Sequence, residues 1–393
     1  MKPAYSCKLF GAHQALSGIR NAVVLFHSVV GCQFGSLSFH VPQEMTRINQ
    51  TCTVISDSDV VFGGENSLSR ALRHVEELYA PQAIFVVTGC VSDIIQDDIH
   101  SVAADFSGRA QVVTVEAAGY RGGISQGYEA GLVALAGCME PCPKSLHPRV
   151  NLLGLGADDP RLSADISAFR ELLDGQVELG AVLSHCTWGE LRQAPAAHLN
   201  LVLGRGLELA KCMENRFGIP YQVLDYPCGL TGAQALWDIL SGAFGLDFSP
   251  ARDRFIQRTA QGLAPAYSYL QALYGIPAAL VASSARARGL AHFLTRELGL
   301  ELVCQAERES LEDVEDFFDQ VRISEAALLF GSSFEAELAD DMELPLFRCD
   351  YPVFDRVCVT DRPLIGPEGT LHFVEDLLNE IMVCRRQKGA LYQ

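Results

Sequence analysis

Three cysteines lie where a metal cofactor could be bound. Cys7 is near the N-terminus, Cys32 follows the apolar run at residues 22–26, and Cys90 follows the apolar run at residues 83–87. In an open parallel α/β sheet, ligands bind at the carboxyl ends of the strands. Cysteine thiolates are the usual ligands of iron–sulfur clusters, so these positions indicate a cluster site at that edge of a sheet.

The same cysteines have an alternative explanation as core residues. Free cysteine is among the most buried residue types, and a cysteine near a strand end is not unusual. Three thiolates also leave one iron of a four-iron cluster without a ligand from this chain. Two interpretations therefore remain open at this point: a cluster completed by another subunit, or thiols that only pack.

No other motif gives a complete catalytic or nucleotide site. Residues 123–127 (GISQG) match the GxSxG nucleophile pattern, but the preceding apolar strand ends at Glu116, too early to form a strand-to-helix elbow. We interpret this stretch as a glycine-rich loop. The chain has no GxxxxGK[ST] motif, so any dependence on ATP must come from a partner.

The composition excludes several classes of function. The 393 residues include 30 Lys and Arg against 48 Asp and Glu, a net charge of −18, which repels nucleic acids and anionic membranes. Hydrophobic residues make up 49% of the chain, but no apolar run is long enough to span a membrane. The 13 cysteines come without a secretory signal, so we expect reduced thiols or metal ligands in a cytoplasmic protein.

The predicted elements alternate between strands and helices along the whole chain. Short apolar runs, typical of buried parallel strands, alternate with segments of helical periodicity such as residues 67–79 and 93–106. The sequence therefore predicts an α/β fold of three Rossmann-like domains with mostly parallel, doubly wound sheets. We place these domains at residues 1–147, 148–250 and 251–393.

Several ordered motifs resemble the nitrogenase component 1 family. In the first domain they are residues 5–12 (YSCKLFGA), 27–32 (HSVVGC), 56–64 (SDSDVVFGG) and 88–98 (TGCVSDIIQDD). Residues 190–195 (ELRQAP) look like the second domain of the family. Residues 350–356 (DYPVFDR) look like the C-terminal motif of its β-type subunits. The resemblance spans nearly the whole chain.

This resemblance implies a cofactor and partners. In the family, two related subunits hold an iron–sulfur cluster between their first domains, through cysteines that match Cys7, Cys32 and Cys90. It implies an [8Fe-7S] P-cluster-like or a [4Fe-4S] centre, an α-type partner in an α2β2 heterotetramer, and an ATP-dependent [4Fe-4S] iron protein as electron donor. The stretch at residues 117–122 (AAGYRG) offers no counterpart of the serine ligand found in some β subunits.

The active-site cofactor is expected on the partner. Cys186 and His372 lack the flanking residues of the cofactor ligands in catalytic α-type subunits. Only six residues precede Cys7, whereas nitrogenase β chains usually have a long arm there. The chain is therefore most similar to the short β-type subunit of a nitrogenase-like reductase such as methylthio-alkane reductase. A scaffold for cofactor assembly and a tetrapyrrole (protochlorophyllide-like) reductase subunit are the alternatives.

Overall fold

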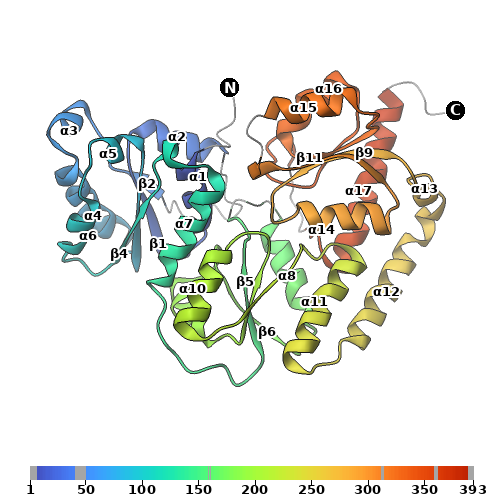
Figure 1. Ribbon diagram of the computed structural model, residues 1–393, viewed down its shortest axis with the longest axis horizontal. Coiled ribbons are helices and arrows are strands. Elements are labelled where there is room, and N and C mark those ends of the chain that lie inside the picture. The colour runs from blue at the N-terminus through green and yellow to red at the C-terminus, as the bar shows by residue number, and fades with distance from the viewer. Residues whose placement is uncertain are drawn as a thin grey trace. The chain divides into compact units, whose positions relative to one another are not determined.

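Three four-stranded sheets follow one another along the chain. The computed structural model describes residues 7–39, 50–157, 159, 161–310, 314–357 and 362–387. The strand orders are β2-β1-β3-β4, β6-β5-β7-β8 and β10-β9-β11-β12, so each sheet repeats the same order. The registered strand pairs in all three sheets are parallel. The predicted fold of three Rossmann-like α/β sheets is confirmed (Figure 1).

The first sheet is covered by helices on both faces. Its strands are β1 (Ala22–His27), β2 (Gln50–Cys52), β3 (Ala83–Thr88) and β4 (Gln111–Glu116). Val24 and Phe26 of β1 pack in one core with α1 (Lys8–Leu16) and α7 (Ile124–Ala136). Val23 and Leu25 pack in the opposite core with α4 (Glu65–Tyr79) and α6 (Ile99–Ala104). Because alternate residues enter alternate cores, this strand is apolar from Ala22 to Phe26.

The GxSxG stretch belongs to a helix, not to a loop. Ile124 begins α7, so the predicted glycine-rich loop at residues 123–127 is wrong beyond Gly123. A Cβ at Gly127 would collide with the main-chain oxygen of Lys8, and one at Gly11 would collide with that of Ile124. The glycines are needed because the backbones of α1 and α7 cross in direct contact.

The second and third sheets are built from similar elements. The strands are β5 (Arg149–Leu153), β6 (Glu178–Val182), β7 (Leu199–Val202), β8 (Tyr221–Val223), β9 (Pro277–Ala282), β10 (Glu301–Glu307), β11 (Leu328–Gly331) and β12 (Leu346–Arg348). The helices in this part are α8 (Leu162–Leu172), α9 (Trp188–Arg192), α10 (Leu207–Phe217), α11 (Gly229–Phe244), α12 (Ser249–Leu263), α13 (Tyr267–Gln271), α14 (Ala287–His292), α15 (Val314–Ile323), α16 (Ala336–Asp341) and α17 (Gly366–Gln387).

Two features differ from the sequence prediction. Sequence periodicity gives no signal for β2, β8 and β12, which are three-residue strands at sheet edges. The helix predicted at residues 93–106 is two short helices, α5 (Cys90–Ile94) and α6. Gln96 has a φ of 58°, and the side chain of Asp98 accepts from the Ser101 amide to begin α6. The left-handed residue and the new N-cap interrupt the helix.

The chain divides into two compact units. One comprises Met1–Asp158 and Gly180–Tyr221, and the other comprises Asp159–Leu179 and Gln222–Gln393. The first sheet lies wholly in the first unit and the third sheet wholly in the second. The boundaries of three domains drawn from the sequence stay a prediction. Within the described residues, no helix has both the length and the apolar character needed to cross a membrane.

Candidate functional site

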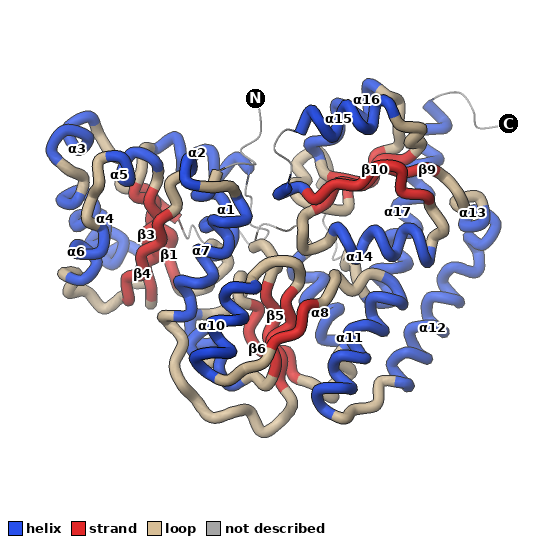
Figure 2. Tube along the Cα trace, in the orientation of Figure 1, coloured by secondary structure: helices blue, strands red, loops and turns tan. Residues whose placement is uncertain are grey.

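The carboxyl ends of β1 to β4 lead into the segments that carry the predicted cysteines. α2 (Val30–Phe39) follows β1, α5 follows β3, and the 3₁₀ helix η1 (Gly119–Arg121) follows β4. Because the strands are parallel, these segments meet at one edge of the sheet. In Figure 1, α2, α3 (Asp57–Phe62) and α5 lie together at this end, and Figure 2 shows the strands leading to it.

Cys7 and Cys90 converge on Gly119. Cys7 is the N-cap of α1 and Cys90 is the first residue of α5. A Cβ at Gly119 would lie 2.9 Å from the Cys7 sulfur and 3.4 Å from the Cys90 sulfur. The Gly119 amide donates to the Cys90 sulfur at 3.2 Å. A residue without a side chain is therefore required where the two thiols meet.

The hydrogen bond to the Cys90 sulfur comes from outside the helix that Cys90 begins. Amides at the start of a helix can stabilise a cysteine thiolate. α5 has only five residues, and the amide that reaches the sulfur is that of Gly119, from the loop after β4. The donor thus comes from a segment distant in sequence.

Cys32 is held by a buried serine. It lies in the first turn of α2, and the hydroxyl of Ser28 donates to its sulfur at 3.2 Å. Ser28 is fully buried, and a Cβ on Gly89 would collide with its hydroxyl. By contrast, a Cβ on Gly31 would meet nothing within 4 Å, so the backbone beside Cys32 is open to an incoming group.

A fourth cysteine at this edge was not singled out by sequence reasoning. Cys52 is the last residue of β2, and its S–H donates to the main-chain oxygen of Ser28 at 3.2 Å. Cys52, Cys32 and Cys7 all pack against the same core, on the α1 and α7 face of the sheet. The only available signal was that Cys52 lies four residues before the motif at 56–64.

The thiols influence one another electrostatically. Burial raises the pKa of the Cys7 thiol, the Leu9 and Phe10 amides lower this pKa, and Cys90 and Cys32 raise it further. Burial is likewise the main cause that raises the pKa of Cys52, where the Val54 amide acts in the opposite direction and Cys32 adds to the rise. Bringing together several thiolates is unfavourable unless a cation compensates their charge.

The donor chemistry of these thiols fits an iron–sulfur cluster. Within the described residues, no three histidine, cysteine, aspartate or glutamate side chains lie close enough together to hold one ion. An iron–sulfur cluster takes each thiolate on a different iron, so its ligands surround it at a distance from one another. Soft sulfur donors around the side-chain-free positions Gly31 and Gly119 meet this requirement.

Exposed apolar side chains lie on the segments at this edge of the sheet. Phe34 of α2 is 72% exposed, Phe62 at the end of α3 is 86% exposed, and Ile94 of α5 is 67% exposed. Val54 and Tyr120, in the loops after β2 and β4, are more than half exposed as well. Apolar groups in such number on the segments at one sheet edge are typical of a surface that a partner covers.

A buried hydrogen bond between a histidine and a carboxylate supports the loops behind the thiols. His27, at the end of β1, contacts Asp97 through Nε2 at 2.8 Å and Thr53 through Nδ1 at 3.1 Å, and its side chain is fully buried. The other oxygen of Asp97 accepts from the Gly64 amide at 2.8 Å. Burial lowers the pKa of His27, while Asp97 opposes this shift. The pair joins the loops after β1, β2 and α3.

The third sheet has the same topology, and a network of buried charges lies at its carboxyl edge. Arg286, whose side chain is 2% exposed, pairs with Asp165 at 3.1 Å and Asp350 at 3.5 Å and also with Asp159. Arg308 makes two hydrogen bonds of 2.9 Å to Glu335. Asp350 begins the DYPVFDR motif, so this motif supplies one carboxylate to the buried network.

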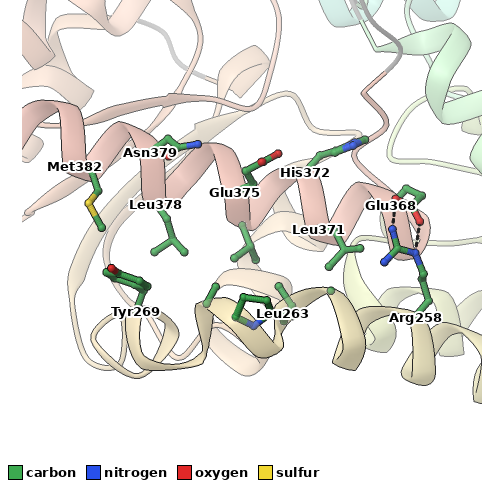
Figure 3. A pocket seen from close by; sticks show the side chains of 14 residues that line it. Arg258, Leu263, Tyr269, Glu368, Leu371, His372, Glu375, Leu378, Asn379 and Met382 are labelled. Carbon is green, nitrogen blue, oxygen red and sulfur yellow. Dashed lines mark hydrogen bonds and ion pairs between the residues drawn. The ribbon is translucent and has the colours of Figure 1, made fainter.

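Two residues considered for an active-site cofactor lie in unsuitable surroundings. Cys186 is 1% exposed in the core of the first unit, and burial raises the pKa of its thiol to about 12. His372 lies on α17 at a groove of about 560 Å³ formed with α12 and α13 (Figure 3). Leu263 and Leu371 line this groove, and an exposed ion pair between Arg258 and Glu368 lies at one end. Neither residue has the setting of a soft-metal ligand.

Comparisons with known proteins agree with the fold and the motifs. The profile of the family described as "Nitrogenase component 1 type Oxidoreductase" matches residues 7–382. A nitrogenase molybdenum-iron protein beta chain from Methanococcus maripaludis is 23% identical over 97% of this chain and 94% of its own length. The solved structure titled "Nitrogenase Cp1 at pH 6.5" superimposes with a TM-score of 0.84 at 20% identity, covering 99% of this chain and 94% of the other.

Relatives of a second kind match part of the chain more strongly. The nitrogenase iron-molybdenum cofactor biosynthesis protein NifE from Clostridium pasteurianum is 33% identical over 55% of this chain. The matched part covers 49% of that relative, so the chain spans about half the length of the first relatives of this kind.

Proposed function

The chain belongs to the nitrogenase component 1 type oxidoreductase family, and we propose that it is the β-type subunit of a nitrogenase-like reductase. In this proposal it works in the cytoplasm and holds an iron–sulfur centre at the interface with an α-type subunit. An ATP-dependent [4Fe-4S] iron protein supplies the electrons. The active-site cofactor is on the α-type partner.

The observation that carries this proposal is the gathering of thiols at the carboxyl edge of the first sheet. Cys7 and Cys90 meet at Gly119, and Cys32 is close enough to raise the pKa of the Cys7 thiol. Cys7, Cys32 and Cys90 are all partly exposed rather than fully buried in the core. The cysteines are exposed at the same sheet edge as exposed apolar side chains. This supports an iron–sulfur centre that a second subunit completes.

Residues of this chain would set the reduction potential of the centre as well as bind it. The centre, when bound, accepts and donates single electrons. Gly119 donates its amide hydrogen to the Cys90 sulfur, and Ser28 donates its hydroxyl hydrogen to the Cys32 sulfur. Hydrogen bonds to ligand sulfurs stabilise the more negative, reduced state and so raise the reduction potential. Phe34, Phe62 and Ile94 would exclude water once a partner covers them.

The test is an anaerobic co-purification with the α-type partner, followed by iron and sulfide analysis and a reductive EPR titration. Roughly eight irons per αβ pair beyond the partner's cofactor would support a P-cluster-like [8Fe-7S] centre, and about four a [4Fe-4S] centre. Cys32→Ala and Cys90→Ala are expected to lose this iron. Cys212→Ala is the matched control, because Cys212 is a half-buried cysteine of the same unit on α10. Full iron content in both site variants would exclude the proposal.

For the substrate we propose a small thioether, as in methylthio-alkane reductase. The reaction R–S–CH₃ + 2e⁻ + 2H⁺ → R–H + CH₃SH cleaves one carbon–sulfur bond, and the iron protein supplies both electrons. Methanethiol in the headspace, released from ethyl methyl sulfide in the presence of iron protein and ATP, would support this proposal. Turnover of protochlorophyllide instead would favour a tetrapyrrole reductase.

A scaffold for cofactor assembly is the second candidate. It is favoured by the 33% identity to the cofactor biosynthesis protein from Clostridium pasteurianum. A scaffold binds a maturing cofactor and passes it on without turnover. The purified complex would then transfer a cofactor to an apo-reductase while reducing no substrate, whereas a reductase subunit supports ATP-dependent turnover.

A further inference from the structure

We propose that Thr88 and Asp93, which lie on either side of Cys90, are positioning residues of the cluster site. Together they hold the Gly119 amide on the Cys90 sulfur and so raise the reduction potential of the centre. The effect on the potential rests on the proposed function. The positioning itself can be measured in the metal-free chain.

Thr88 holds the chain where it leaves β4. The registered pairs of β3 and β4 end at Thr88 and Glu116, and the hydroxyl oxygen of Thr88 accepts from the next amide, that of Ala117, at 3.1 Å. Both Thr88 and Ala117 are buried. Because a buried amide without a partner is unfavourable, this hydrogen bond fixes the chain two residues before Gly119.

Asp93 holds the two residues that follow Gly119. Its Oδ2 accepts from the Tyr120 hydroxyl and pairs with Nε of Arg121 at 2.9 Å. The side chain of Asp93 is only 10% exposed, whereas that of Arg121 is 53% exposed. A largely buried carboxylate requires hydrogen-bond donors, and here two of them come from η1. These contacts therefore fasten η1 to α5, the helix that Cys90 begins.

The two contacts act on opposite sides of one amide. Thr88 and Asp93 lie in the segment that carries Cys90, and their partners flank Gly119. Gly119 cannot carry an anchoring side chain, because a Cβ there would lie 2.9 Å from the sulfur of Cys7. The position of its amide, 3.2 Å from the Cys90 sulfur, therefore depends on its neighbours. Groups that orient the partners of a metal ligand affect the properties of the centre.

Hydrogen exchange in the metal-free chain tests the positioning directly. Mass spectrometry with fragmentation that resolves single amides measures the exchange rate of Gly119. Asp93→Ala removes both contacts to η1, so this amide should exchange about tenfold faster. Asp105→Ala is the matched control, because Asp105 is an exposed aspartate at the C-terminal end of α6, and it should leave the rate unchanged. Wild-type exchange in Asp93→Ala would overturn the inference.

Uncharged variants test the effect on the centre in the anaerobic αβ complex. Thr88→Val removes the hydroxyl acceptor with little change in volume. It should lower the midpoint potential and change the EPR signal, because the hydrogen bond to the Cys90 sulfur weakens. Thr88→Ser keeps the hydroxyl and should have the wild-type potential. Tyr120→Phe removes a contact of Asp93 at a side chain that is 58% exposed, so it should lower the potential without affecting folding.

The outcomes separate this inference from the function on which it rests. A wild-type potential in both Thr88→Val and Tyr120→Phe would overturn the inference. An equal fall of the potential in Thr88→Ser would overturn it too, because packing and not the hydroxyl would then be responsible. Absence of iron from the wild-type complex would instead overturn the proposed function, while the exchange rate of Gly119 in the metal-free chain would still measure the positioning.

Discussion

The first and third sheets have the same strand order, but different kinds of side chain lie at their carboxyl edges. At the carboxyl edge of the first sheet, partly exposed thiols lie among exposed apolar side chains. At the same edge of the third sheet, Arg286 and Arg308 are buried among carboxylates that they neutralise. Topology therefore defines where a doubly wound sheet can bind a ligand, and the side chains of the loops decide whether that place stays open.

The difference also separates the cysteine motifs of the first sheet, which serve function, from the DYPVFDR motif of the third sheet, which serves stability. The cysteine motifs place partly exposed thiols at the edge of the first sheet. The DYPVFDR motif ends in satisfied contacts: Asp350 accepts from Ser283 and Arg286, and Asp355 accepts from Arg348 at 2.8 Å. Substitutions at the third edge should therefore reduce stability, and substitutions at the first edge should reduce function.

The largest effect on stability is expected from Arg286→Met. The change leaves Asp159 and Asp165 buried without their cation, while Asp350 keeps only Arg308, and loss of one partner of a buried ion pair typically costs about 3–5 kcal/mol. Urea unfolding followed by circular dichroism measures this loss. Burial already raises the pKa of Asp159 to about 6, so the loss should be smaller at pH 5 than at pH 7.5, where the carboxylates are ionised.

Arg258→Met is the control for that substitution. Arg258 pairs with Glu368 on the surface, where both side chains are more than 40% exposed, and exposed pairs contribute about 0–1 kcal/mol. Equal destabilisation by the two variants would contradict the contrast between a buried edge and a solvated surface pair.

Cys32→Ala should show the reverse behaviour. The variant is expected to lose the iron of the complex, while the free energy of unfolding of the metal-free chain changes by about 1 kcal/mol or less, because Cys32 is only half-buried. Iron analysis of the complex and urea unfolding of the metal-free chain measure the two effects. Unfolding of the metal-free variant would mean that the thiol is mainly a packing residue.

Gly119→Ala should cause a smaller, partial loss of iron. The new methyl group would lie 2.9 Å from the sulfur of Cys7, a distance that forces one of the two to move. Iron retention under a chelator should fall, with the fold intact. Gly242→Ala is the control: a Cβ at Gly242, inside α11, meets nothing within 4 Å, so this variant should keep its iron and gain about 1 kcal/mol at most.

The smallest effect concerns pH and the His27–Asp97 pair. Burial lowers the pKa of His27 below its unfolded value of about 6.5. As the pH falls from about 6.5 toward the lowered pKa, the unfolded chain binds the proton first, so the free energy of unfolding decreases by at most about 1.4 kcal/mol per pH unit. Urea midpoints of the metal-free chain between pH 7.5 and 5.5 measure this slope. In His27→Gln the slope should be smaller, and an unchanged slope would show that other groups cause it.

Local patterns predicted the framework because their signals are local. The strands β1 and β3 each begin with five consecutive apolar residues, β4 contains three valines, and α4 has a clear amphipathic period, so neighbouring residues suffice to identify them. The strands β2, β8 and β12 have three residues each, too few to establish a period. Because β2 had no such signal, Cys52 at its end was missed.

The amino-acid sequence by itself determined the three α/β sheets, the positions of Cys7, Cys32 and Cys90 after or before regular elements, and the family motifs. Only the tertiary structure decided which groups meet these thiols. Cys52 and Ser28 are 24 residues apart, and Cys90 and Gly119 are 29 residues apart. Such contacts depend on parallel strands ending at a common edge, and no local periodicity encodes which loops then touch.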